Sequence, residues 1–234
     1  MSKPDTTISP ISRPASATPT VELLADLGCP WCYVAFRRLR RLQQEASLVL
    51  VWRPFLLNPY LPPEGMDRAS YRSRKFGSLE ASRRLDRRLV EIGAQDGIAF
   101  AFERIVRTPQ TVAAQGLLLT AQRRGVAELA AERLFAAMFV QGRDIGDLGE
   151  LAREASHLGL DWQPPSPGEA PPQAAAVIAS HERACAAGVT GVPLLTFRPG
   201  LSIAGAQSLD ALRAMLDLAR YRMRAEADQG RQAS

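Results

Sequence analysis

This 234-residue chain has few cysteines, histidines and lysines and no long apolar run, and each scarcity excludes a class of protein. No segment approaches the roughly 18 consecutive apolar residues that a membrane-spanning helix needs, so we expect no membrane span. The three cysteines are too few, and odd in number, for a secreted scaffold held together by disulfides. The hydrophobic content of 46% and the charged content of 23% are ordinary for a globular protein and exclude disorder throughout.

Lysine occurs only at Lys3 and Lys75, so the formal net charge of +5 comes almost entirely from arginine. A basic protein can bind nucleic acid or a membrane surface. Here the arginines between positions 37 and 41 alternate with apolar residues at helical spacing, and acidic residues interrupt those between 83 and 88. We interpret both runs as solvated helix faces in preference to a binding patch, and expect neither nucleic acid nor membrane as a partner.

The first twenty residues are rich in proline, serine and threonine and do not contain the apolar core of a signal peptide. We therefore expect a disordered arm on a cytoplasmic protein.

Two of the cysteines lie at a predicted junction between a strand and a helix. Residues 21–25 form a short apolar run that predicts a buried strand. From Pro30 to about Glu45, apolar residues recur among arginines as in an amphipathic helix, with proline in its first turn. The β-prone run at 48–52 predicts a second strand, so the economical assembly is a parallel βαβ unit with the cysteines at its first junction.

The motif Cys29-Pro30-Trp31-Cys32 can close a small disulfide ring. A helix N-terminus offers unpaired N–H groups and a positive dipole, which favour the thiolate of Cys29. We therefore expect Cys29 to be the attacking thiolate and Cys32, one turn inside, to be the resolving thiol. Trp31 is expected to be exposed near Cys29, where it could contact substrate.

The order of the remaining elements completes a fold prediction. A helical region is followed by a helix, two strands that form a hairpin at 194–197 and 201–204, and a last helix that ends near Met223. This order matches an α/β thioredoxin fold with a large all-helical insert between its second and third strands. The predicted parts are an arm (1–20), the βαβ half (21–61), the insert (62–172), the second half (173–223) and a frayed tail (224–234).

Several segments resemble those of the FrnE-like branch of the DsbA family of thiol–disulfide oxidoreductases. They occur in family order across most of the chain, and they are the stretches 26–33, 52–55, 57–59, 188–193 and 205–207. The resemblance implies a thioredoxin fold, a redox-active dithiol at Cys29 and Cys32, and a cis peptide bond before Pro193. From the residues alone that bond would be trans, because only about one X–Pro bond in twenty is cis in folded proteins.

The resemblance also implies the partners of the protein. A turn at Val192-Pro193 would face the substrate, together with Pro30 and Trp31. Protein or small-molecule thiols and disulfides are the expected partners, with glutathione as a candidate co-substrate. No metal or nucleotide cofactor is implied, and both a monomer and a homodimer are compatible with the sequence.

Two alternatives to disulfide exchange stay open. The same superfamily contains glutathione-dependent 2-hydroxychromene-2-carboxylate isomerases, which commonly carry serine where this chain has Cys29 and need no resolving thiol. Because this chain keeps both sulfurs, we favour dithiol exchange. The other alternative is a zinc-bound or redox-inactive binding module, in which His181 and Cys185 would complete a Cys-Cys-His-Cys site. The strand–motif–helix context favours redox use.

Four further positions carry expectations. Cys185 is interpreted as a small buried hydrophobe rather than a second redox centre, and Trp52 as a core residue. Asp26 is interpreted as a turn residue in preference to a carboxylate that affects proton transfer. Members of the family often carry Pro-Asn-Thr where this chain has Pro-Gln-Thr at 109–111, so we expect polar contacts from that segment to differ.

Overall fold

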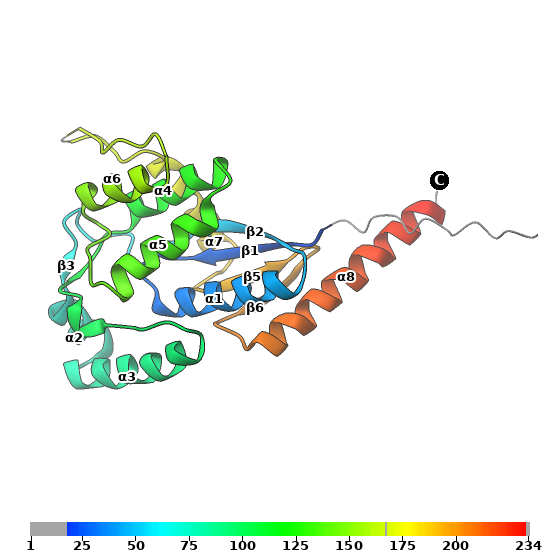
Figure 1. The fold of residues 1–234 in the computed structure, drawn as a ribbon, viewed down its shortest axis with the longest axis horizontal. Coiled ribbons are helices and arrows are strands. Elements are labelled where there is room, and N and C mark those ends of the chain that lie inside the picture. Colours follow the sequence, from blue (N-terminus) through cyan, green and yellow to red (C-terminus); the bar gives the residue numbers. More distant parts are fainter. Residues whose placement is uncertain (1–17, 167, 233–234) are drawn as a thin grey trace, which may run out of the picture.

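The computed structural model describes residues 18–166 and 168–232, and its centre is a four-stranded sheet in the order β2-β1-β5-β6 (Figure 1). β1 runs parallel to β2 and antiparallel to β5, and β5 forms an antiparallel hairpin with β6. The strands are β1 (Thr20–Ala25), β2 (Val49–Pro54), β5 (Leu194–Phe197) and β6 (Leu201–Ala204). Most of the predicted arm, residues 1–17, lies outside the described residues.

Three helices complete a thioredoxin fold around this sheet. α1 joins the two parallel strands, α7 precedes β5, and α8 follows β6. α1 packs against α8, whereas α7 packs against β2 and the insert helix α4. Their bounds are α1 (Pro30–Glu45), α7 (Ala174–Ala186) and α8 (Leu209–Gln232).

The segment between β2 and α7 is the predicted helical insert. It also contains a two-residue antiparallel strand pair, β3 with β4, and a short 3-10 turn, so it is not all-helical as predicted. The insert elements are β3 (Met66–Asp67), α2 (Arg68–Phe76), α3 (Leu79–Gln95), η1 (Phe102–Arg104), β4 (Arg107–Thr108), α4 (Val112–Arg123), α5 (Ala127–Phe139) and α6 (Leu148–His157). The fold class is therefore the predicted one.

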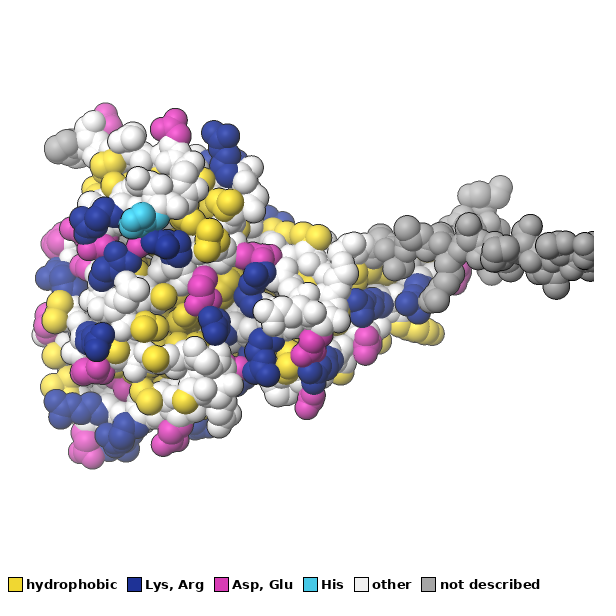
Figure 2. All heavy atoms as spheres, viewed as in Figure 1, with side chains coloured by type: hydrophobic (Ala, Val, Ile, Leu, Met, Phe, Trp, Pro, Cys, Tyr) yellow, Lys and Arg dark blue, Asp and Glu magenta, His cyan; other side chains and the backbone are white. Residues whose placement is uncertain are grey.

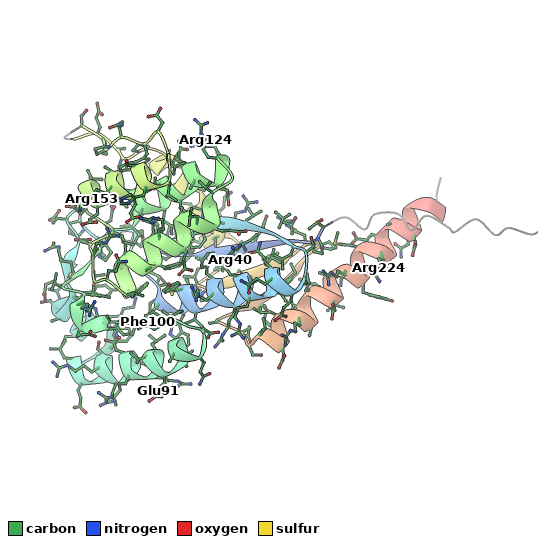
Figure 3. The ribbon with its side chains drawn as sticks, in the orientation of Figure 1. Arg40, Glu91, Phe100, Arg124, Arg153 and Arg224 are labelled. Carbon is green, nitrogen blue, oxygen red and sulfur yellow. The ribbon has the colours of Figure 1, made fainter. Side chains whose placement is uncertain are left out.

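An aromatic cluster joins the insert to α1. Tyr33 stacks on Phe135 of α5 with ring centroids 4.8 Å apart, and Phe100 meets Tyr33 edge-on at 5.9 Å. Phe100 lies between α1 and α3 (Figure 3). A Cβ atom at Gly93 would come within 2.5 Å of the Phe100 ring. Gly93 therefore marks a close approach within the helix, and α3 continues to Gln95.

The last helix is longer than predicted. Its apolar stripe, Leu212, Leu216 and Ala219, is buried, and none of the described side chains beyond it is buried. The helix nevertheless continues to Gln232, and Figure 1 shows its C-terminal half extending beyond the body of the molecule. Alanine, arginine and glutamate, which are strong helix formers, account for this continuation. The prediction of a frayed tail from 224 is therefore wrong up to residue 232.

The surface carries charges of both signs. Basic and acidic side chains are interspersed over the face drawn in Figure 2. Arg40, between α1 and α5 (Figure 3), pairs with Glu128, and Arg37 pairs with Glu132 at 3.0 Å. None of the helices in the described part of the chain combines the length and apolar character that a bilayer crossing requires.

Two glutamines of α4 fasten the insert to the sheet. Gln122 accepts from the Trp52 backbone N–H at 2.6 Å and donates to the Trp52 carbonyl at 3.3 Å, which covers the open edge of β2. Gln115, fully buried, donates to the carbonyls of Ala25 (3.0 Å) and Phe55 (3.1 Å) and accepts from the Trp52 indole at 2.8 Å. Trp52 is itself a core residue, as predicted. Gln115 thus ties together the chain at the ends of β1 and β2.

Replacing Gln115 by leucine is expected to destabilise the protein, because it removes the Gln115 partner of the Phe55 carbonyl and of the Trp52 indole N–H. The Ala25 carbonyl also loses one of its two donors, although it still accepts from the Phe55 N–H at 2.9 Å. We expect the free energy of unfolding, measured by urea denaturation, to fall by about 3 kcal/mol. Gln44→Leu changes the same residue type at an exposed position of α1 and should shift it by less than about 0.5 kcal/mol. Equal effects of the two substitutions would contradict the assigned role of Gln115.

Candidate active site

The strand directions bring three segments to one edge of the sheet. Because β1 and β2 are parallel, with Ala25 opposite Pro54, the segments that follow both strands leave at the same edge. β5 is antiparallel, with Leu194 opposite Leu24, so the segment that precedes it arrives there. The topology alone therefore places the cysteine loop next to residues 55–59 and next to Val192 and Pro193.

The cysteine loop leads directly into α1. Cys29 is the N-cap residue of the helix and has an extended backbone, and Pro30 occupies the first turn. The N–H of Cys32 donates to the Cys29 carbonyl at 3.0 Å, which closes that turn. No side chain caps the helix and its first turn contains no acidic residue. The positive end of the helix dipole beside Cys29 is an environment that stabilises negative charge on sulfur.

The two thiols are both buried, to different degrees. Cys29 is 4% exposed and Cys32 0%. Burial, followed by the hydrogen bond and the charge of Cys29, raises the pKa of the Cys32 thiol well above its usual range. Cys32 therefore holds its proton more tightly than a free cysteine.

The segment before β5 lies against Cys29. The Cys29 sulfur is 3.8 Å from the Val192 carbonyl oxygen, and the Val192–Pro193 peptide bond is cis. Pro193 is buried and Val192 is half-buried. A second cis bond, Arg198–Pro199, lies in the β5–β6 turn.

The dipeptide between the cysteines is less exposed than the sequence suggested. Pro30 and Trp31 are both half-buried, and Trp31 packs against the hydrophobic core. Part of each ring is left at the surface near Cys29. Four of the six predicted site residues thus lie at the start of α1 and two lie in the turn before β5. The contact between Cys29 and the Val192 carbonyl joins the two groups.

Asp26 is a site residue whose role the sequence analysis underestimated. Its carboxylate is 2% exposed and accepts three hydrogen bonds. Oδ1 accepts from the Gly28 N–H (2.9 Å) and the Thr111 hydroxyl (2.9 Å), and Oδ2 accepts from the Leu57 N–H (2.7 Å). The Asp26 carbonyl also accepts from the Cys29 N–H at 3.0 Å. This one residue therefore connects the cysteine loop, the segment after β2 and the insert.

Burial raises the pKa of the Asp26 carboxyl, whereas its hydrogen bonds to Gly28, Leu57 and Thr111 act in the opposite direction. A raised folded-state pKa means that ionising Asp26 opposes folding, so its contribution to stability declines as the pH rises through that pKa. The sequence feature that could have revealed the role of Asp26 is its place between a buried strand and Gly28-Cys29. The partner at position 111 is 85 residues away, beyond the reach of local patterns.

A cavity of about 520 Å³ lies beside the cysteine loop. Leu57, which donates to Asp26, forms part of its wall, as do Asn58, Tyr71, Arg74 and Lys75. The Tyr71 hydroxyl donates to Asn58 Oδ1 at 2.6 Å and accepts from Lys75 Nζ at 2.7 Å. The volume of the cavity is in the range of small-molecule sites. The two positive charges in its wall, Arg74 and Lys75, favour an anionic ligand.

Cys185 is exposed, so the prediction that it is buried is wrong. The buried face of α7 consists of Ala174 and Val177, and Cys185 lies two turns beyond it. Its sulfur is 3.7 Å from His181 Nε2, while His181 Nδ1 accepts from the Leu56 N–H at 3.4 Å. Among the described residues no three His, Cys, Asp or Glu side chains gather as metal ligands. The zinc alternative therefore has no support in this geometry.

Comparison with known families gives one match over most of the chain. A model described as the DSBA-like thioredoxin domain matches residues 20–217. No protein of curated function matches the sequence.

Solved structures share the fold. A probable DsbA oxidoreductase from Streptomyces coelicolor superposes with a TM-score of 0.74 at 24% identity, covering 86% of this chain and 89% of the other. A 2-hydroxychromene-2-carboxylate isomerase gives a TM-score of 0.60 at 16% identity, covering 90% and 98%. The cytosolic disulfide reductase DsbM from Pseudomonas aeruginosa, in a structure with GSH, gives 0.55 at 20% identity, covering 89% and 99%. At these identities the likenesses establish the fold alone.

The burial of the three thiols predicts the order in which they react. When the reduced protein is treated with iodoacetamide and analysed by peptide mass spectrometry, Cys185 should be modified first and Cys32 last. We expect Cys32 to react at least roughly tenfold more slowly than Cys185, because Cys32 is buried and its pKa is raised. Cys185→Ser should remove the fast phase, and in urea all three should react alike. Equal rates for Cys32 and Cys185 in the folded protein would contradict this order.

Proposed function

The chain belongs to the family of DSBA-like thioredoxin domains, and on this premise we propose that it is a thiol–disulfide oxidoreductase that works through Cys29 and Cys32. The observation that carries the proposal is the placement of Cys29 at the uncapped N-terminus of α1, with Cys32 one turn inside and fully buried. A single nucleophile would need no second sulfur in that position, whereas disulfide exchange does.

The reaction balances without a cofactor. When the protein acts as a reductant, the Cys29 thiolate attacks one sulfur of a substrate disulfide, and the other sulfur leaves as a thiolate that takes up a proton. Cys32 then loses its proton and attacks the Cys29 sulfur, which releases the second substrate thiol and forms the Cys29–Cys32 disulfide. The reverse sequence transfers that disulfide to a dithiol substrate.

The environment of Cys32 suits this order of events. Its pKa is raised by burial and also by the hydrogen bond and charge of Cys29. Once Cys29 is bonded to substrate it carries no negative charge, so that part of the effect disappears. Cys32 would then lose its proton more readily at the step where it must attack.

The neighbouring segments supply a place for the substrate. The Val192 carbonyl, 3.8 Å from the Cys29 sulfur, belongs to the turn that we propose faces the substrate. Backbone groups of that turn could pair with an extended peptide. Pro30 and Trp31, both half-buried, would form the apolar side of the same surface.

Glutathione is the small-molecule co-substrate that we propose. It carries two carboxylates, and the cavity beside the cysteine loop is lined by Arg74 and Lys75. An exposed free thiol at Cys185 is compatible with a compartment that keeps thiols reduced, and on this basis we propose that the protein is cytoplasmic.

A redox titration of the dithiol against glutathione tests the proposed function. In the Cys185→Ser background we expect a reversible two-electron transition. The fluorescence of the adjacent Trp31 monitors it, and thiol counting checks it. Cys29→Ser should abolish it, and Cys32→Ser should accumulate a mixed disulfide at Cys29. The midpoint gives the direction of electron flow.

No transition at any glutathione ratio, with both thiols remaining free, would exclude disulfide exchange. A Cys32→Ser protein that retains full turnover would instead support a glutathione-dependent isomerase, which needs a single thiol. The two outcomes separate the alternatives without knowledge of the physiological substrate.

Lys75→Gln is expected to weaken binding of oxidised glutathione, because it removes one positive charge from the cavity. We expect KM for oxidised glutathione to rise roughly fivefold, as befits the loss of a partly exposed charge contact. KM for an uncharged disulfide, bis(2-hydroxyethyl) disulfide, should not change. Arg84→Gln removes an exposed positive charge that pairs with Glu80 on α3 and serves as the control. An unchanged KM for oxidised glutathione would exclude a role for Lys75 in binding it.

A further inference from the structure

Thr111 occupies the N-cap position of α4 and yet does not cap that helix. Asp67, Ser78 and Asp147, at the same position of α2, α3 and α6, each accept from an N–H of their own helix at 2.8 to 3.0 Å. Such a cap contributes about 1 kcal/mol to helix stability. α4 lacks this contribution, although it begins with a residue able to provide it.

Both the hydroxyl and the methyl group of Thr111 face the cysteine loop. Its hydroxyl donates to Asp26 Oδ1 at 2.9 Å, where both side chains are buried. Its methyl group would lie 3.4 Å from a Cβ atom at Gly28. Gly28 and Asp26 are the residues that fix Cys29, whose N–H donates to the Asp26 carbonyl. Thr111 therefore reaches the nucleophile's loop through a hydrogen bond and through packing.

We infer that Thr111 is a positioning residue for the dithiol: its hydroxyl holds the Asp26 carboxylate in the orientation that locks the loop presenting Cys29. The inference rests on the proposed function, since it concerns the reactivity of the same pair of cysteines. It makes the insert part of the redox centre, because the N-cap residue of α4 determines how the loop of the thioredoxin half is held.

The electrostatics around Asp26 give this role a measurable signature. The charged and titratable groups that act on the Asp26–cysteine region are Cys29 at the N-cap of α1, Cys32 on α1 and Lys75 on α2. α4 contributes the uncharged Thr111 and the segment after β2 contributes the Leu57 N–H, while His181 of α7 bonds to the next residue, Leu56. The Thr111 hydroxyl is one of three donors that lower the pKa of Asp26. Its removal must raise that pKa further.

The experiment compares Thr111→Val with Thr111→Ser and Thr120→Val in the Cys185→Ser background. Valine keeps the shape of threonine without the hydroxyl, and serine keeps the hydroxyl without the methyl. Thr120 is the matched control, since its hydroxyl donates to the Gly116 carbonyl within α4 at 3.1 Å. The rate of reaction of each reduced protein with oxidised glutathione is measured against pH, and the Asp26 carboxyl is titrated by carbon-13 NMR.

We expect Thr111→Val to lower the rate roughly tenfold, because a displaced nucleophile reacts slowly. The Asp26 inflection in the pH profile and its NMR titration should both move up by about one pH unit. Thr111→Ser should keep the wild-type inflection, and Thr120→Val should match the parent in every measurement.

Two results would overturn the inference. One is a Thr111→Val protein that equals the parent in rate and pH profile. The other is a slower rate with an unmoved Asp26 titration, which would leave Thr111 a packing role alone. If the parent itself shows no disulfide exchange, the proposed function fails, while the NMR titration still decides whether Thr111 holds Asp26.

Asp26→Asn keeps the inference testable if Thr111→Val does not fold. Asparagine retains the shape and one acceptor oxygen but cannot ionise. It should remove the Asp26 inflection from the pH profile, whereas the rise in rate that accompanies ionisation of the attacking thiol remains. A pH profile of Asp26→Asn that is identical to that of the parent would overturn the inference.

Discussion

The constraint on which this site depends is that both oxygens of a carboxylate buried at the edge of the sheet must be hydrogen-bonded. In the described part of the chain no cation contacts Asp26 directly, and its hydrogen bonds come from uncharged donors on three separate segments. An unsatisfied buried carboxylate costs several kcal/mol. The cysteine loop, the segment after β2 and the insert can therefore reach their native positions only together. Gln115 imposes a similar condition one turn along α4, where its amide serves the ends of β1 and β2.

The parts of the structure that could be predicted from the sequence depend on local patterns. Pro30 with the apolar spacing behind it gave both ends of α1, and the Pro-Gly turn gave both strands of the hairpin at their observed bounds. The order of these elements was sufficient for the fold class, and it also placed the two cysteines at the β1–α1 junction.

The features that escaped prediction depend on contacts between distant residues. Asp26 looks like a turn residue until Thr111 is brought beside it, and Gly93 looks like a helix end until the Phe100 ring is placed against it. Cys185 was misjudged because its helix is covered by neighbours only in its first half. Helix α8 continues past its last buried residue on intrinsic propensity. The periodicity of the sequence does not indicate any of these features.

The attachment of the insert has an evolutionary consequence. The insert holds the cysteine loop through the start of α4, whereas α2, with Tyr71, Arg74 and Lys75, forms the wall of the neighbouring cavity. Mutations in α2 can therefore alter which molecules are accommodated without disturbing the hydrogen bonds that hold the nucleophile. Under the proposed function, a lineage with this architecture can diversify its substrates while it keeps the hydrogen bonds that hold the cysteine loop. Lys75 still links the two, because it lines the cavity and its charge lowers the pKa of the Asp26 carboxyl.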